Sequence, residues 1–357
     1  MRNLDEALER FHVADLEYAG GLSNHGPMGA EALESIGHQA LIPAFLDLYA
    51  PRLPPAEPGR VLDEAERRAL RGDPDRRADW VATFEALVRD GEWREVVREV
   101  VPDLLPGLFA SAGHGLLRTA HAVRALERED SALRRRELAR GLAAWAAREQ
   151  SLPGRPGARA TAADRERGLR AFFDALPLLR DPAAREGLIL AAAPRLAGLA
   201  PFVEAIERAP TPEAGADVEG WLVELAREGA GLYLAHPEAR IAYVHGVTLP
   251  VALRELTPLL DAESARAGAG FVLQAVAALH SLFGERRQPD ALDEDVVRTA
   301  EDWDEIRYRA ACSIQEHAIK MAEACWRMDT IAPDRVFRLA ASDAALRLEG
   351  SRSAGGC

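Results

Sequence analysis

The sequence predicts an all-α fold, organised as a single large multi-helix globular domain. Of the 357 residues, 48 % are hydrophobic, and the mean hydropathy is −0.16, which is typical of a packed protein in water. Alanine, leucine, arginine and glutamate are abundant and runs of β-branched residues are scarce, so the composition favours helices over strands. Apolar residues also recur at helical spacing along most of the chain.

The N-terminal half is expected to contain helices separated by short breaks. Paired glycines end the first helix, and proline suits the first turn of the next one. Four prolines between residues 51 and 59 predict a loop. The expected elements are a helix over 1–20, a polar turn over 22–27, a helix from Pro27 to about Tyr49, three polar helices between Val61 and Val101, and two helices between Pro106 and Arg148 that break near Asp130-Ser131.

The C-terminal half is expected to be helical as well. SLPGRPG at 151–157 is the clearest linker, and a loop rich in proline, glycine and acidic residues lies near 209–217. Residues 241–245 could form a strand, but it would have no partner, so we expect a helix. The helical groups are 162–207, with breaks at Asp181-Pro182 and Pro194, 218–283, with a break at His236-Pro237, and 292–348, after a polar connection at 286–290. The domain therefore covers 1–350, and a disordered tail follows at 351–357.

The charge balance argues against some classes of partner. A net charge of −13 and a pI of about 5.3 disfavour binding to nucleic acid or to an anionic membrane surface. Cys312, Cys325 and Cys357 cannot form a disulfide framework, and no apolar run approaches the length of a membrane span. The N-terminal residues MRNLDEALERFH lack the apolar region of a signal peptide. We therefore expect a cytoplasmic protein; its oligomeric state stays open, a homodimer included.

Several well-known catalytic motifs are missing from the sequence. It contains no G-x-G-x-x-G, no Walker loop, no G-x-S-x-G and no H-E-x-x-H. A ferritin-like di-iron bundle needs two Glu-x-x-His motifs, and only Glu9-x-x-His12 fits. No pair of cysteines has the spacing of a zinc site. A recognisable nucleotide-binding fold is therefore not expected.

The nine histidines carry the remaining chemical signal. His25 lies in a turn before a helix, and His114 stands between two glycines in an expected apolar helix. His245 lies in another apolar segment, while His317 and Lys320 are three residues apart and so share one helix face. The other histidines in ordinary helical or loop contexts are expected to be structural or exposed: His12, His38, His236 and His280.

Lys320 is the only lysine among 44 basic residues. Arginine can replace lysine on a solvated surface, but not where an amine must lose its proton or form a covalent adduct. Histidines from four distant apolar segments suggest one buried histidine-rich metal site, because imidazole is a good ligand for iron, zinc, copper or nickel. Taken singly, each histidine is more often a hydrogen-bonded core residue than a ligand, so spacing alone leaves both interpretations open.

Four segments resemble the signature regions of the questin oxidase family. They are LSNHGPMGAEALESIG, GHGLLRTAHAVRAL, YVHGVTLPVALREL and EHAIKMAEACWR, and the resemblance extends from about Leu22 to Trp326. Members of that family are all-helical, and the fungal ones oxidise and open aromatic polyketides of the anthraquinone type. They are described either as Baeyer–Villiger-type monooxygenases without a flavin motif or as non-haem iron oxygenases with histidine ligands and a carboxylated lysine.

The resemblance implies a residue for each role. It makes His25, His114, His245 and His317 ligands of Fe(II) and makes Lys320 a CO2-modified lysine that serves as an anionic oxygen ligand. Whether His121 is a ligand, a proton relay or neither stays open; we place it beside the metal, and on chemical grounds we expect His121 or Arg118 to stabilise a developing phenolate or oxyanion. The implied partners are O2 and a small aromatic phenol or quinone; whether NADPH supplies electrons stays open.

Other functions remain compatible with the sequence. One is a metal-free Baeyer–Villiger-type monooxygenase in which the histidines act as acids and bases. Another is a non-enzymatic helical ligand-binding protein with structural histidines. A zinc site with a hydrolytic role is a lesser alternative, because imidazole ligands do not select the metal by themselves. A helical phosphohydrolase is disfavoured, because the sequence has no His-Asp dipeptide.

Overall fold

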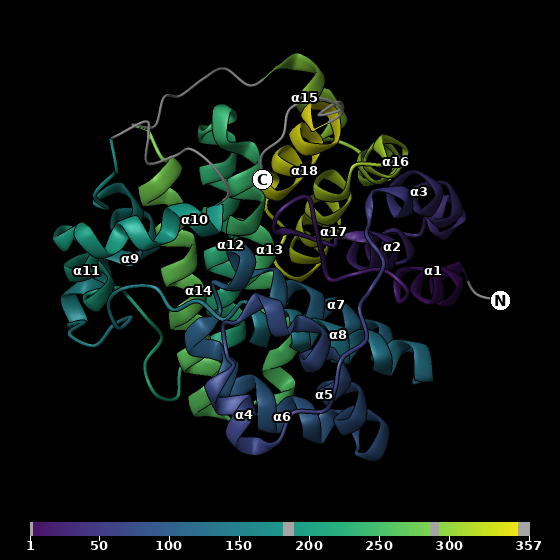
Figure 1. Ribbon diagram of the computed structural model, residues 1–357. Coiled ribbons are helices and arrows are strands. Elements are labelled where there is room, and N and C mark those ends of the chain that lie inside the picture. Colours follow the sequence, from purple (N-terminus) through teal and green to yellow (C-terminus); the bar gives the residue numbers. More distant parts are fainter. Residues whose placement is uncertain (1–2, 181–188, 286–292, 349–357) are drawn as a thin grey trace. The chain divides into compact units, whose positions relative to one another are not determined.

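The computed structural model describes residues 3–180, 189–285 and 293–348 (Figure 1). Within these residues the regular structure is helical apart from one two-stranded antiparallel hairpin, which pairs β1 (Glu17–Tyr18) with β2 (Leu22–Ser23). The all-α fold class is therefore confirmed. The segments 181–188, 286–290 and 351–357, for which the sequence predicts a break, a polar connection and a disordered tail, lie outside the described residues.

The chain divides into two compact units, each of which is described here by itself. The first contains residues 3–151 together with Pro258–Leu260, and the second contains the other described residues from 152 onward. The boundary coincides with the start of the linker at 151–157, where proline and glycine exclude regular structure. The single domain over 1–350 stays a prediction.

The first unit is built around the antiparallel neighbours α7 and α8. Close packing of these helices depends on glycine: a Cβ atom on Gly115 would lie 2.5 Å from the Trp145 Cα atom, and one on Gly141 would lie 2.9 Å from the Thr119 backbone nitrogen. The helices of this unit are α1 (Asn3–Phe11), α2 (Gly26–Ser35), α3 (Ile42–Tyr49), α4 (Glu64–Ala69), α5 (Arg77–Asp90), α6 (Trp93–Leu104), α7 (His114–Arg128) and α8 (Ala132–Ala147).

The second unit has a core of longer helices. α12 and α13 meet at a pair of glycines, because a Cβ atom on Gly229 would lie 2.1 Å from the carbonyl oxygen of Gly246. The helices of this unit are α9 (Ala162–Asp174), α10 (Ile189–Ala192), α11 (Ala200–Glu207), α12 (Val218–Ala235), α13 (Arg240–Leu256), α14 (Ala262–Phe283), α15 (Glu294–Thr299), α16 (Trp303–Ser313), α17 (Glu316–Ile331) and α18 (Arg335–Arg347).

One helix of the second unit is long and apolar enough to cross a membrane. It is α14, and 78 % of its most apolar window is buried within the protein. The expectation that no apolar run approaches a spanning length was therefore wrong for this segment. The burial of most of this window is that of a helix in the core of the unit.

The structure corrects three of the predicted helices. The first ends at Phe11 rather than at residue 20, because the chain turns into the hairpin. The second is interrupted between Ser35 and Ile42, where Gly37 adopts a left-handed φ of 84°. The helix expected from Pro106 begins only at His114, so this histidine starts a helix instead of lying inside one.

Other local predictions are confirmed. Three α-helices lie between residues 61 and 104, and α7 and α8 separate at residues 129–131. The segment 241–245 belongs to α13, and the loop at 209–217 contains no regular element. The helix expected over 218–283 breaks at His236-Pro237, as predicted, and breaks again after Leu256.

Candidate metal centre

His25 occupies the N-cap position of α2. Its backbone N–H donates to the Tyr49 hydroxyl at 2.8 Å, and the side-chain oxygen of Asn24 accepts from the Gly26 N–H at 3.0 Å. Gly26 is required here because a Cβ atom would lie 2.4 Å from the Phe11 ring. The turn is therefore held on both sides, which fixes where the His25 imidazole can point.

His114 is the first residue of α7 and follows a strained stretch of backbone. Ser111, Ala112 and Gly113 all have left-handed backbone angles, with φ of 46°, 58° and 86°. For the two residues with side chains this conformation costs on the order of 1–3 kcal/mol each. It turns the Ser111 carbonyl toward His114, whose Nδ1 atom is in hydrogen-bonding contact with that oxygen.

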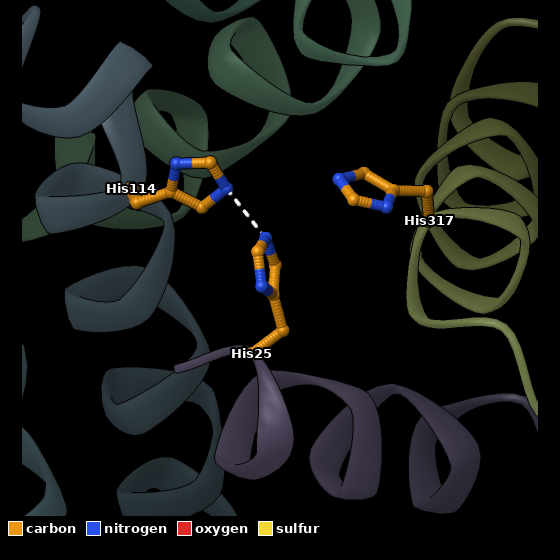
Figure 2. Close-up of side chains that lie close together, drawn as sticks. All are labelled: His25, His114 and His317. Carbon is orange, nitrogen blue, oxygen red and sulfur yellow. Dashed lines mark hydrogen bonds between the residues drawn. The ribbon is translucent and has the colours of Figure 1, made fainter. Parts of the chain in front are cut away.

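The imidazoles of His25 and His114 meet inside the first unit. Their Nε2 atoms are 2.7 Å apart, and the rings are nearly perpendicular at 89° (Figure 2). Both side chains are buried, with 2 % and 8 % of their surface exposed. The two residues are 89 positions apart, so tertiary structure alone creates this pair.

The Ser111 carbonyl orients the ring of His114. A carbonyl oxygen can only accept, so the Nδ1 atom of His114 carries its hydrogen and the Nε2 atom presents a lone pair. The same arrangement orients histidines that bind metals. Two such nitrogens can share one proton or bind one cation.

His121 belongs to a separate buried cluster of charges. Its Nδ1 atom contacts the Glu31 carboxylate, which also accepts hydrogen bonds from Arg124 and Arg128. Burial alone would raise the pKa of Glu31, but the charges of Arg124, His121 and Arg128 outweigh it and hold the pKa well below its usual range. Glu31 is therefore ionised and restrains the His121 ring.

Arg118 lies one helical turn after His114 and is paired with a buried carboxylate. Its Nε and Nη2 atoms donate to Glu137 at 2.6 and 3.0 Å, and the other side of Glu137 contacts His12 at 3.1 Å. Burial would raise the pKa of Glu137, but Arg118 and His12 lower it to about 2. Arg118 is therefore fixed in place rather than mobile.

In the second unit, His317 is the second residue of α17 (Figure 2). The side-chain oxygen of Gln315 caps this helix and accepts from the His317 backbone N–H at 2.7 Å. Ile314, just before the cap, has a left-handed φ of 56°, which is unusual for a β-branched residue. As with His114, backbone in the left-handed region precedes a histidine in the first turn of a helix.

His245 and Lys320 complete the predicted residues of this unit. The His245 ring lies on α13 with its centre 6.2 Å from that of His317. Lys320 lies one turn after His317 on α17, and only 1 % of its surface is exposed. A lysine buried to this degree is rare, because an ammonium ion is costly to remove from water.

Two further histidines of the second unit form a different cluster. His236 stacks on Tyr243 with ring centres 4.7 Å apart, and the Tyr243 hydroxyl is hydrogen-bonded to His280 at 2.7 Å. The Nδ1 atom of His236 is also 2.7 Å from the Leu232 carbonyl oxygen. These contacts are those of hydrogen-bonded core residues.

The structure thus brings the predicted residues together in two sets, one in each unit. The first set is His25 and His114, with Arg118 beside them, and the second is His245, His317 and Lys320. Sequence reasoning missed Glu31 and Glu137, which orient His121 and Arg118. Glu31 lies in one of the four segments that resemble the questin oxidase family, so its position could have marked it as a candidate. Glu137 lies in an ordinary helical pattern, and nothing in the sequence distinguishes it.

Comparisons with known proteins add no identification. No family model matches the chain, and no curated protein matches it. The resemblance to questin oxidases therefore remains a prediction from the four segments.

Proposed function

We propose that the protein is a non-haem iron oxygenase that acts on a polycyclic aromatic phenol or quinone. The observation that supports the metal site is the buried His25–His114 pair with its carbonyl-fixed tautomer. The substrate class and the use of O2 rest on the resemblance alone. Ferrous iron with histidine ligands and an open coordination position supplies the activation of O2 for this class of reaction.

The geometry of the pair suits a transition-metal ion. Imidazole nitrogens bind such ions at about 2.0–2.1 Å, which places two ligands at right angles roughly 3 Å apart. The His25 and His114 nitrogens are 2.7 Å apart, so a small outward shift of either ring would accommodate an ion. The Ser111 carbonyl would keep the lone pair of His114 directed at it.

The remaining ligands follow from the resemblance. His245 and His317 would add two neutral imidazoles, and Lys320 would add an anionic carbamate after reaction of its neutral amine with CO2. Burial favours the neutral amine over the ammonium form. Arginine could not replace it, because a guanidinium keeps its proton. The carbamate would offset part of the charge of the metal in a buried site.

Two residues of the first unit would interact with the substrate, one through its charge and one by proton transfer. Arg118, held by Glu137, would present a fixed positive charge to a developing phenolate. His121, held by Glu31, would accept or return a proton. One cleft of the first unit, about 640 Å³, is lined by α5 and by residues 130–136. These lie beyond the far end of α7, a helix roughly 20 Å long, so this cleft is not proposed as the substrate site.

A second candidate is a metal-free monooxygenase. The 2.7 Å contact between His25 and His114 also suits two imidazoles that share a proton, and such a pair could act as an acid and a base. This enzyme would contain no iron and would take the two electrons that reduce the second oxygen atom of O2 to water from NADPH or another reductant. The metal content of the purified protein separates the two candidates.

The experiment measures iron in the full chain purified from iron-supplemented cells. We expect equimolar iron in the natural sequence and in the control His38→Ala, which changes a half-buried histidine outside the proposed ligands. His114→Ala and Lys320→Arg should lose the iron, together with O2 uptake on hydroxyanthraquinones. Circular dichroism confirms that each variant is folded. Iron-free natural protein, or full loading of Lys320→Arg, would contradict the metal proposal.

A further inference from the structure

A small cavity in the first unit lies between Arg118 and His114. Its volume is about 10 Å³, which is room for one water-sized molecule. The polar residues among those that line it are Glu17, Ser23, Asn24, Ser111, His114 and Arg118. Apolar side chains close the rest of the wall, so an occupant would depend on these few groups.

Arg118, which lines this cavity, has a hydrogen-bond donor left over. Its Nε and Nη2 atoms are used by Glu137, whereas its Nη1 atom is buried and has no hydrogen-bond partner among the described residues. Only 2 % of the Arg118 surface is exposed. A buried guanidinium donor without an acceptor lowers the stability of the folded protein. An occupant of the cavity that accepts a hydrogen bond would remove this cost.

The buried charges that interact with Arg118 favour an anion over water. Arg140 is a second buried guanidinium, and it donates to the Ala14 carbonyl oxygen rather than to a carboxylate. Burial, followed by the charge of Arg118, lowers the pKa of Arg140 to about 10, so it remains charged at neutral pH. Two buried guanidinium groups therefore share one buried carboxylate, that of Glu137.

The other nearby groups do not remove this positive excess. Glu17, at the wall of the cavity, is held by Arg148 through two hydrogen bonds of 2.6 Å. Asp15 is likewise paired with Arg77, at 2.6 Å. Burial lowers the pKa of His12, so this ring is neutral and contributes no charge at pH 7.

We infer that the cavity between Arg118 and His114 binds one halide-sized anion, held by the Arg118 Nη1 atom. The anion would supply the missing acceptor and would neutralise the excess charge with a charge-assisted hydrogen bond. His114, a proposed iron ligand, lines the same cavity, but the anion would be held by the Arg118 guanidinium and not by an imidazole nitrogen. It can therefore be tested on protein from which metal has been removed with a chelator.

The experiment locates bromide in crystals of the chelator-treated full chain soaked in sodium bromide. We expect an anomalous peak in the cavity, within hydrogen-bonding distance of the Arg118 Nη1 atom. The matched control is the double variant Arg118→Leu/Glu137→Leu, which removes the guanidinium and its carboxylate together and leaves neither charge unpaired. The peak should be lost in this variant while bromide on the surface remains.

A solution measurement gives an independent answer. At equal ionic strength, chloride should raise the midpoint of thermal unfolding of the natural sequence relative to gluconate, and the double variant should show equal midpoints. The inference is overturned if water alone fills the cavity in bromide-soaked crystals, or if the natural sequence has the same midpoint in both salts. Neither result would bear on iron binding.

Discussion

The two units hold their buried histidines by different means. In the first, charged groups orient the rings and their neighbours: Glu31 holds His121 and Glu137 holds Arg118. In the second, His236 stacks on an aromatic ring and His280 is hydrogen-bonded to a neutral phenol. Buried charges stabilise only while both partners are present, whereas stacked rings depend on shape. The stability of the first unit should therefore depend mainly on charge and pH, and that of the second unit on the volume of its side chains.

The largest effect is expected from breaking a buried pair in the first unit. Glu137→Leu leaves Arg118 charged and unpaired, which should lower the free energy of unfolding by about 3–5 kcal/mol. The double variant Arg118→Leu/Glu137→Leu should recover most of this loss, because neither member of the hydrogen-bonded pair is left as an unpaired charge. Urea unfolding followed by circular dichroism gives both values. Equal losses in the single and double variants would show that the pair is held by packing rather than by charge.

Acid should weaken the first unit through the same carboxylates. The folded-state pKa values of Glu31 and Glu137 lie below the ordinary value of 4.5, and that of Glu137 is about 2. Their contribution to stability is therefore present above pH 4.5 and is lost as the pH falls toward 2, up to about 3 kcal/mol for Glu137.

Hydrogen exchange measured by mass spectrometry between pH 7 and pH 3 detects this loss of stability in individual peptides. After correction for the intrinsic exchange rate, peptides from α7 and α8 should lose protection as the pH falls. Glu137→Gln should flatten the pH dependence of these peptides, because it removes one of the two titrating groups. An unchanged pH dependence in that variant would contradict the assigned role of Glu137.

Added volume should disturb the second unit at the contact of α12 with α13. Gly229→Ala places a methyl group against the Gly246 carbonyl, which belongs to the backbone and cannot rotate away. We expect a loss of about 1–3 kcal/mol. Gly231→Ala is the control on the same helix, since nothing lies within 4 Å of its added methyl, and it should gain about 0.5–1 kcal/mol. Thermal unfolding compares the two, and equal effects would rule out a close approach at Gly229.

The smallest effect is expected at the phenol of the second unit. Tyr243→Phe removes the hydrogen bond to His280 but keeps the ring that stacks on His236. We expect a loss of about 1 kcal/mol, the usual value for a neutral hydrogen bond. Chemical denaturation measures it. A loss as large as that of Glu137→Leu would mean that the two units do not differ in the way described.

The sequence by itself determined the helical class and most of the local boundaries. Alanine, leucine and arginine favour helices, and SLPGRPG marks the boundary of the two units, because these effects act within a few residues. The sequence also singled out His25 and His114, through a turn and two flanking glycines. It placed His114 inside a helix, because the left-handed run at Ser111 and Ala112 has no strong signature in residue type.

Only the tertiary structure decided which partners these residues have. The contact of His25 with His114 spans 89 positions, that of His12 with Glu137 spans 125, and that of His121 with Glu31 spans 90. No local preference selects such pairs, because hydrogen bonds and charge pairing depend on distance in space. The sequence could therefore propose which residues matter, but packing determined that Glu31 and Glu137 hold them.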